Sequence, residues 1–169
     1  MTKTRPIRLI EDLSLIRGKL LEFDAEVLLV DPLMAFFGKG RDTNSVSDVC
    51  DAMYMLKMLA EETGVCVLLN TWETKNATGR RLSRLLGSVG FAGVVRAAFT
   101  VAEDPANIET MVLACSKMNI AKMPVSQAFK VIGTTIVDPK EGSIETAKVE
   151  WLGATDLKAD DLAPKQETR

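Results

Sequence analysis

The chain is organised around one short stretch, Glu26-Val27-Leu28-Leu29-Val30-Asp31-Pro32. Its four consecutive Leu and Val residues predict a strand that is buried on both faces of a sheet. The strand ends at Asp31, and α/β sheets bind their ligands at the carboxyl ends of the strands. Pro32 stops further pairing because it has no N–H group to donate to the sheet. Asp31 therefore has two interpretations: it holds a Mg²⁺ ion, directly or through water, or it only caps the following turn.

The sequence on both sides of this strand predicts alternating helices and strands. Helices are predicted at 12–23, 45–63 and 82–94, and further strands at 65–69 and 97–102. Asp12 is a plausible cap of the first helix, and Gly64 is placed to end the second. Short buried strands joined by amphipathic helices predict a parallel sheet with helices on its faces.

The pattern changes in the second half of the chain. Short strands separated by turn residues are predicted at 110–116, 127–131, 135–137 and 147–151. They indicate an antiparallel C-terminal extension of a mostly parallel sheet. From Asp156 onward the sequence is charged and poor in apolar residues. The sequence therefore predicts one α/β domain over 1–155 and a flexible tail over 156–169.

Composition excludes several classes of function. The length of 169 residues suits one domain, and a net charge of -2 gives no global attraction to nucleic acid. The chain has no histidine, which removes His-based catalytic triads and most catalytic zinc sites. Its three cysteines form no CxxC motif and indicate reduced thiols in a cytoplasmic protein. No apolar run approaches the ~20 residues of a membrane span, and the start lacks the apolar core of a secretory signal.

Several segments match one family in a fixed order. They are the residues at 28–33, 42–44, 59–65 and 84–88, then Arg96, and then Lys-Met-Asn at 117–119. In this order they resemble the second half of RecA-like ATPases of the plasmid RepA replicative-helicase type. The likeness covers about residues 10–132. It implies a fragment of a RecA-like three-layer sandwich, with a role in DNA replication or on a mobile genetic element.

The resemblance also implies roles for single residues. Asp31 resembles the Walker B aspartate, which orients Mg²⁺ on a bound nucleoside triphosphate. Arg96 and Lys117 are similar to basic residues that act near the nucleotide, where they stabilise charge on the transferring phosphate. Asn119, beside them, is implied to contact the nucleotide. The alternative for Arg96 and Lys117 is a surface charge paired with a carboxylate.

Two departures from the family bear on activity. The phosphate-binding pattern G-x-x-x-x-G-K-[ST] occurs nowhere in the chain, and neither does the strand that carries the family's catalytic glutamate. The family's histidine after the second strand is replaced by Trp72. We therefore expect no bound cofactor, and Mg-ATP only where a partner completes the site. Without the missing strand, the strand at 97–102 is expected to pair with 65–69, or two chains are expected to pair edge to edge.

A basic segment follows the second strand. It comprises Trp72, Lys75, Arg80, Arg81 and Arg84. Basic residues beside an aromatic ring can hold single-stranded nucleic acid through phosphate contacts and base stacking, which would give a weak DNA contact. The alternative is a solvated loop that leads into a helix.

Three hypotheses for the function remain open. The first is a truncated, degenerate relative of RepA-type ATPases, inactive alone, that acts as a homo-oligomer (a dimer or larger) or with a complete ATPase partner. The second is a non-catalytic protein- or nucleic-acid-binding domain on the same scaffold. The third is half of a split ATPase that another chain completes.

Overall fold

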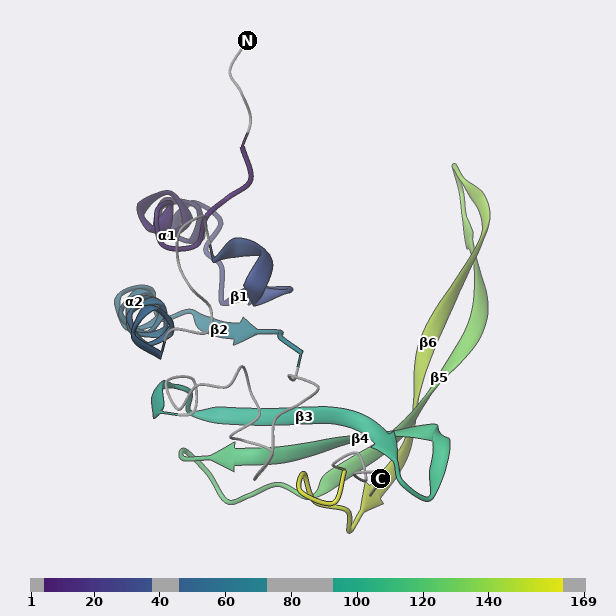
Figure 1. Ribbon diagram of the computed structural model, residues 1–169. Coiled ribbons are helices and arrows are strands. Elements are labelled where there is room, and N and C mark those ends of the chain that lie inside the picture. Colours follow the sequence, from purple (N-terminus) through teal and green to yellow (C-terminus); the bar gives the residue numbers. More distant parts are fainter. Residues whose placement is uncertain (1–4, 38–45, 73–92, 163–169) are drawn as a thin grey trace, which may run out of the picture. The chain divides into compact units, whose positions relative to one another are not determined.

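The computed structural model describes residues 5–37, 46–72 and 93–162. The chain divides into two compact units, Met1–Val95 and Arg96–Arg169, whose helices and strands are labelled in Figure 1. Each unit has a hydrophobic core of its own. The fold is mixed α/β, with a parallel two-stranded sheet in the first unit and an antiparallel four-stranded sheet in the second. The helix predicted at 82–94 lies almost entirely outside the described residues.

The N-terminal unit alternates helices with the two parallel strands. Its elements are α1 (Leu13–Glu22), β1 (Val27–Val30), the short 3-10 helix η1 (Leu33–Phe36), α2 (Val46–Thr63) and β2 (Cys66–Leu69). The β1–β2 register runs from Val27 opposite Cys66 to Val30 opposite Leu69. The first two predicted helices and the predicted parallel pairing of the first two strands are thereby confirmed.

The two helices end in different ways. Gly64 follows α2 with a φ of 72°, the left-handed conformation that glycine adopts at helix ends. Asp12 precedes α1, but its side chain makes no capping hydrogen bond, so the predicted cap is wrong. Its carboxylate instead accepts hydrogen bonds from the Arg8 backbone N–H at 2.8 Å and from both terminal nitrogens of Arg5 at 2.6 and 2.8 Å. Asp12 therefore fastens the segment before α1.

These hydrogen bonds of Asp12 predict that the stability of the fold depends on pH. The hydrogen bond from Arg5, followed by that from the Arg8 N–H, holds the pKa of Asp12 below its ordinary value. The ionised Asp12 carboxylate stabilises the fold fully above the pKa that Asp12 has in the unfolded chain. This stabilisation is lost as the pH falls through the lower pKa that Asp12 has in the folded chain. We expect Asp12→Asn to be less stable than wild type at about pH 6, with the gap closing toward about pH 2. Thermal melts across this range test it, with Asp51→Asn on the exposed side of α2 as control; a gap that does not change with pH would contradict it.

The core of the N-terminal unit lies on one face of the β1–β2 sheet. Val30 packs there with buried residues of both helices, among them Leu20 of α1 and Leu59 of α2. On the other face, the exposed fractions are 58% for Leu29 and 55% for Leu68. The prediction that the first strand is buried on both faces is therefore wrong in the described structure. Side chains alternate along a strand, and only one of the two sets meets the core that α1 and α2 share.

The C-terminal unit is an antiparallel meander. Its strands are β3 (Ala97–Asp104), β4 (Asn107–Met118), β5 (Ser126–Asp138) and β6 (Gly142–Thr155), adjacent in chain order. The prediction that the strand at 97–102 pairs with 65–69 is wrong, because β3 pairs antiparallel with β4. A two-residue turn joins β3 to β4, and Asp104 accepts a hydrogen bond from the Ala106 N–H in it. A partner this near in sequence costs little loop-closure entropy.

The strands of this unit are longer than the sequence predicts. The segments at 127–131 and 135–137 belong to one strand, β5, in which Gly133 lies opposite Ala147 rather than in a turn. The turn comes after Asp138, whose carboxylate accepts hydrogen bonds from the N–H groups of Lys140 and Glu141 at 2.7 and 2.9 Å. All four strands of this unit are antiparallel, and among the described strands only β1 and β2 pair in parallel. The prediction of a mostly parallel sheet is therefore wrong for the described strands.

The second core includes residues beyond the last strand. Val112 and Ala114 of β4 are fully buried, and Ala159 and Leu162 pack against them with 6% and 4% of their surface exposed. Residues 156–162 were expected to begin a flexible tail and instead close this core. The rest of that predicted tail, 163–169, lies outside the described residues.

Candidate nucleotide site

The strongest candidate site lies where β1 and β2 end side by side. Asp31 follows β1, Asn70 follows β2, and the Asn70 side-chain amide donates a 2.8 Å hydrogen bond to the Asp31 carboxylate. The backbone joins the same two ends, because the Asn70 N–H donates to the Val30 carbonyl at 2.9 Å and its own carbonyl accepts from the Leu33 N–H at 2.8 Å. Both side chains are exposed. The arrangement holds a carboxylate at the carboxyl ends of two parallel strands, the edge at which α/β sheets generally bind ligands.

A buried polar group lies in the next residue. The Thr71 hydroxyl is buried and has no hydrogen-bond partner in the described structure. Buried polar atoms in native proteins are nearly always paired, so an orphan hydroxyl calls for a water, an ion or a ligand group. Its position directly after Asn70 places this unmet group in the same chain segment as the Asp31 contact.

The site offers one carboxylate, that of Asp31, which would be only part of the coordination shell of a Mg²⁺ ion. Among the described residues, no group of three or more Cys, His, Asp or Glu side chains could hold a metal. Mg²⁺ in nucleotide enzymes keeps several waters and takes one or two carboxylates, with phosphate oxygens as its other ligands. Within the described residues, the Asp31 carboxylate has no hydrogen bond or ion pair besides that with Asn70, so it can serve as such a carboxylate. The ion would be held only together with a phosphate group.

The other residues with predicted nucleotide roles lie together in the C-terminal unit. Arg96 immediately precedes β3, and its carbonyl accepts a 2.9 Å hydrogen bond from the backbone N–H of Asn119, just past β4. Lys117 lies opposite Ala98 in the β3–β4 ladder. The side chain of Arg96 is exposed and forms no ion pair with a described residue, which does not support the alternative of a paired surface charge. Asp31 belongs to the other unit.

The predicted nucleic-acid surface is described only at its first residue. Trp72 has 61% of its surface exposed. Lys75, Arg80, Arg81 and Arg84 lie outside the described residues, and their role stays a prediction. Trp72 alone is an exposed ring of the kind on which a base can stack.

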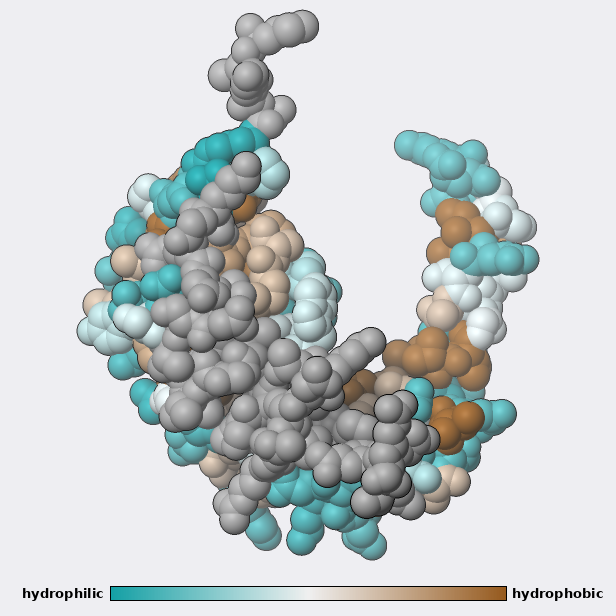
Figure 2. Space-filling model, in the orientation of Figure 1, coloured by the Kyte–Doolittle hydropathy of each residue, from teal (hydrophilic) through white to brown (hydrophobic). Residues whose placement is uncertain are grey.

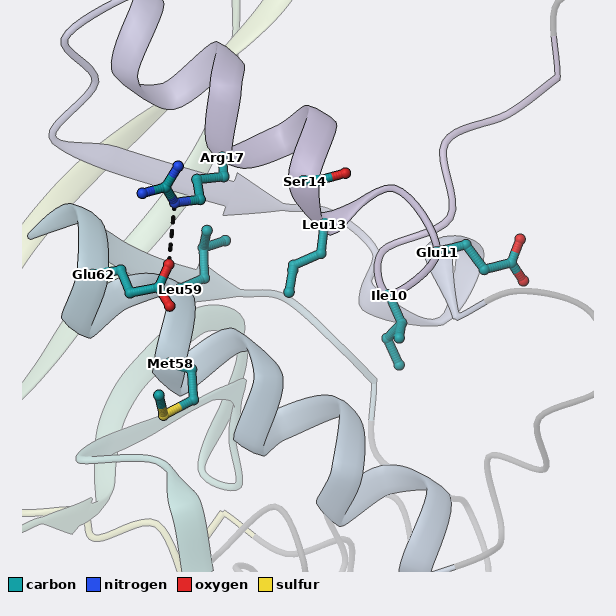
Figure 3. Close-up of a pocket in the computed structure, with 8 residues that line it drawn as sticks. All are labelled: Ile10, Glu11, Leu13, Ser14, Arg17, Met58, Leu59 and Glu62. Atoms are coloured by element: carbon teal, nitrogen blue, oxygen red, sulfur yellow. Dashed lines mark hydrogen bonds and ion pairs between the residues drawn. The ribbon is translucent and has the colours of Figure 1, made fainter.

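A groove between α1 and α2 contains none of the predicted site residues. It has a volume of about 410 Å³, and the side chains of Leu13 and Leu59 lie between the two helices (Figure 3). The lining residues are Ile10, Glu11, Leu13, Ser14, Arg17, Met58, Leu59 and Glu62. At its rim Arg17 donates a 3.1 Å hydrogen bond to Glu62, and both side chains are about half exposed. A pair this exposed contributes little to stability, and the groove is best understood as the seam between two helices.

Reasoning from the sequence missed Asn70 and Thr71 as site residues. A signal for Asn70 was present, because it follows the second predicted strand as Asp31 follows the first. The carboxyl ends of adjacent parallel strands lie together, so a parallel pairing of these strands places Asp31 and Asn70 next to each other. Nothing in the sequence indicated that the Thr71 hydroxyl would be buried.

Comparison with models of known protein families gave no match, and comparison with curated proteins gave none either. No helix among the described residues is long and apolar enough to cross a membrane.

Proposed function

We propose that this chain is a degenerate RecA-like ATPase relative that supplies the Mg²⁺-orienting half of a nucleotide site and acts only in assembly with another chain. The observation that carries the proposal is the hydrogen-bonded pair Asp31 and Asn70 at the carboxyl ends of two parallel strands. A carboxylate in this position suits the metal on a nucleoside triphosphate. The order of motifs that resembles RepA-type helicases supports the same proposal.

The proposed division of labour follows from what the 169 residues contain. They include no phosphate-binding loop, so the groups that cradle the phosphates must come from outside these residues, and we propose that a partner supplies them. Without that loop, the transferring phosphate lacks most of the positioning and charge stabilisation on which phosphoryl transfer depends. The chain is therefore expected to bind Mg-ATP weakly alone and not to hydrolyse it.

The exposed face of the β1–β2 sheet supports assembly. Val27, Leu29 and Leu68 each have more than half of their surface exposed on it, and in the described structure β1 and β2 pair only with each other. Apolar side chains gathered on one sheet face indicate a protein contact. The same observation favours the second candidate function, a non-catalytic protein-binding domain on this scaffold.

A thermal melt with saturating Mg-ATP distinguishes the two functions. At about one hundred times the dissociation constant, the nucleotide should add about 2.7 kcal/mol to the free energy of unfolding. We expect wild type to shift, Asp31→Asn to shift much less, and ATP with a chelator in place of Mg²⁺ to shift wild type as little as Asp31→Asn. The matched control is Asp51→Asn, the same change at an exposed position of α2, which should respond as wild type does. Equal melts with and without Mg-ATP would reject the nucleotide site and favour the protein-binding domain.

A further inference from the structure

β5 and β6 continue beyond the rest of their sheet as a two-stranded ribbon. β4 pairs with β5 only from Met111 opposite Phe129 to Leu113 opposite Gln127. Residues 130–150, here called the ribbon, therefore pair only as β5 with β6 (Figure 1). Two strands alone are marginally stable in water, and a sheet of three or more with an apolar face is needed for independent stability. The ribbon is thus an incomplete sheet.

The surface of the ribbon is rich in exposed apolar residues. Their exposed fractions include 58% for Val131, 78% for Val137 and 49% for Val149. Figure 2 shows hydrophobic patches along the ribbon, separated by hydrophilic ones. Nucleic acid does not fit this surface, because its basic residues are outnumbered by acidic ones. The charged residues are Lys130, Lys140 and Lys148 against Asp138, Glu141, Glu145 and Glu150.

The outer edge of β6 is open along the strand. β6 is the last strand of the sheet and pairs only with β5, so its outward N–H and C=O groups have no strand beside them in the described structure. Such an edge is a template for a further strand. Lys148 and Glu150 follow each other on one face of this edge, and neither forms an ion pair with a described residue. Opposite charges two residues apart make the edge complementary to an inverted copy of itself.

We propose that β6 pairs antiparallel with β6 of a second copy of this chain, with Val149 opposite Val149 at the two-fold axis. In this register Lys148 of each copy lies opposite Glu150 of the other, so both charge pairs form at once. Val149 meets its counterpart on the other face, and Ala147 meets Trp151. The two ribbons together become a four-stranded sheet, and the contact is the isologous kind that a two-fold dimer requires.

Neighbouring registers are worse. A two-fold axis at Lys148 or at Glu150 places like charges directly opposite each other, which is destabilising. An axis at Ala147 or Trp151 leaves both charged residues without a charged partner. A bulge limits the strand on one side, because Phe129 pairs with Trp151 while Ala128 pairs with Gly153, leaving Leu152 extra. β6 is regular from Gly142 to Trp151, so the five residues centred on Val149, 147–151, all lie on the regular side of this bulge.

A second copy of this chain also lacks the phosphate-binding loop, so the dimer does not complete the nucleotide site. It is a separate contact that the assembly in the proposed function would use. It needs neither nucleotide nor Asp31. Asp31→Asn should dimerise as wild type does, and a monomeric variant should keep the Mg-ATP shift of the isolated chain. Each proposal can therefore fail while the other stands.

Light scattering after size-exclusion chromatography, over a concentration series without nucleotide, tests the dimer. We expect a wild-type dimer and, for Lys148→Glu, a dissociation constant at least about tenfold higher, because both charge pairs become repulsive. Lys148 lies opposite Ile132 in its own chain, so this change breaks no ion pair within the ribbon. The control is Lys140→Glu, the same charge change in the turn of the ribbon, which should dimerise as wild type does.

A mixing experiment tests the register itself. Lys148→Glu presents two acidic residues and Glu150→Lys two basic ones, so each should be monomeric alone and an equimolar mixture should form a heterodimer. Circular dichroism first establishes that each variant is folded. A wild type that is monomeric at every concentration, or a Lys148→Glu variant as dimeric as wild type, would overturn the dimer. A mixture that stays monomeric would overturn the register.

Discussion

Leu59→Ala is expected to lower the free energy of unfolding of the N-terminal unit by about 2–5 kcal/mol. Leu59 lies on α2 with 2% of its surface exposed, in the core that joins both helices to β1. Truncation removes the transfer free energy of the buried side chain and leaves a cavity between the two helices that the backbone cannot fully close. In Figure 3 the side chains of Leu59 and Leu13 lie between the helices that carry them.

The matched control for this variant is Leu15→Ala on α1. Leu15 has 55% of its surface exposed, so the same truncation should change the free energy of unfolding by less than about 0.5 kcal/mol. Denaturant titration measures both variants. Amide hydrogen exchange adds a spatial test: Leu59→Ala should speed exchange in α2 and β1, and leave β4 and β5 unchanged, because the two units have separate cores. Equal losses in the two variants would contradict this assignment of the core.

The N-terminal unit was predictable because its signals are local. The apolar spacing that gave the helices at 12–23 and 45–63 and the four aliphatic residues before Asp31 depend on neighbours in the sequence. The parallel pairing followed from the helix between the two strands. What the sequence could not tell was how many layers cover the sheet. A run of Val and Leu is the same whether one face of the strand is covered or both, and Leu29 is exposed.

The C-terminal unit shows why strand partners are harder to predict. The strand at 97–102 was found at nearly the right residues, but its partner was assigned by resemblance to a parallel sheet rather than by the two-residue turn that follows it. The segment between 131 and 135 is predicted as a turn that separates two short strands, although β-branched residues continue the strand beyond Gly133. The ribbon itself had no sequence signal. Whether a strand is central or at an edge depends on pairings that only the folded chain defines.

The residues of the candidate site also differ in whether a local pattern or only the fold reveals them. Asp31 could be chosen from the sequence because a strand that ends in an acid and a proline is a local pattern. Its partner Asn70 is 39 residues away and became visible only when β1 and β2 were placed side by side. Arg96, Lys117 and Asn119 were selected through resemblance, and the β3–β4 ladder places them near one another.

Phe129→Ala is expected to lower the free energy of unfolding of the C-terminal unit by about 3–5 kcal/mol. Phe129 is the residue of β5 that has Met111 of β4 on one side and Trp151 of β6 on the other. Its ring is 9% exposed and lies 5.2 Å from the Trp151 ring in a tilted arrangement. Such aromatic pairs contribute about 0.5–1.5 kcal/mol beyond the area they bury. The truncation thus weakens the point where the ribbon joins the sheet.

Tryptophan fluorescence measures this variant directly. The chain has two tryptophans, so a Trp72→Phe background leaves Trp151 as the only source. Phe129→Ala should shift its emission to the red and lower the denaturant midpoint, whereas Val137→Ala, at a position 78% exposed near the tip of the ribbon, should do neither. The variant should also dimerise poorly, because β6 loses the support that fixes residues 147–151. In Lys148→Glu, by contrast, the dimer is lost while the denaturant midpoint of the monomer is kept. A Phe129→Ala protein as stable as Val137→Ala would show that the ribbon does not depend on this junction.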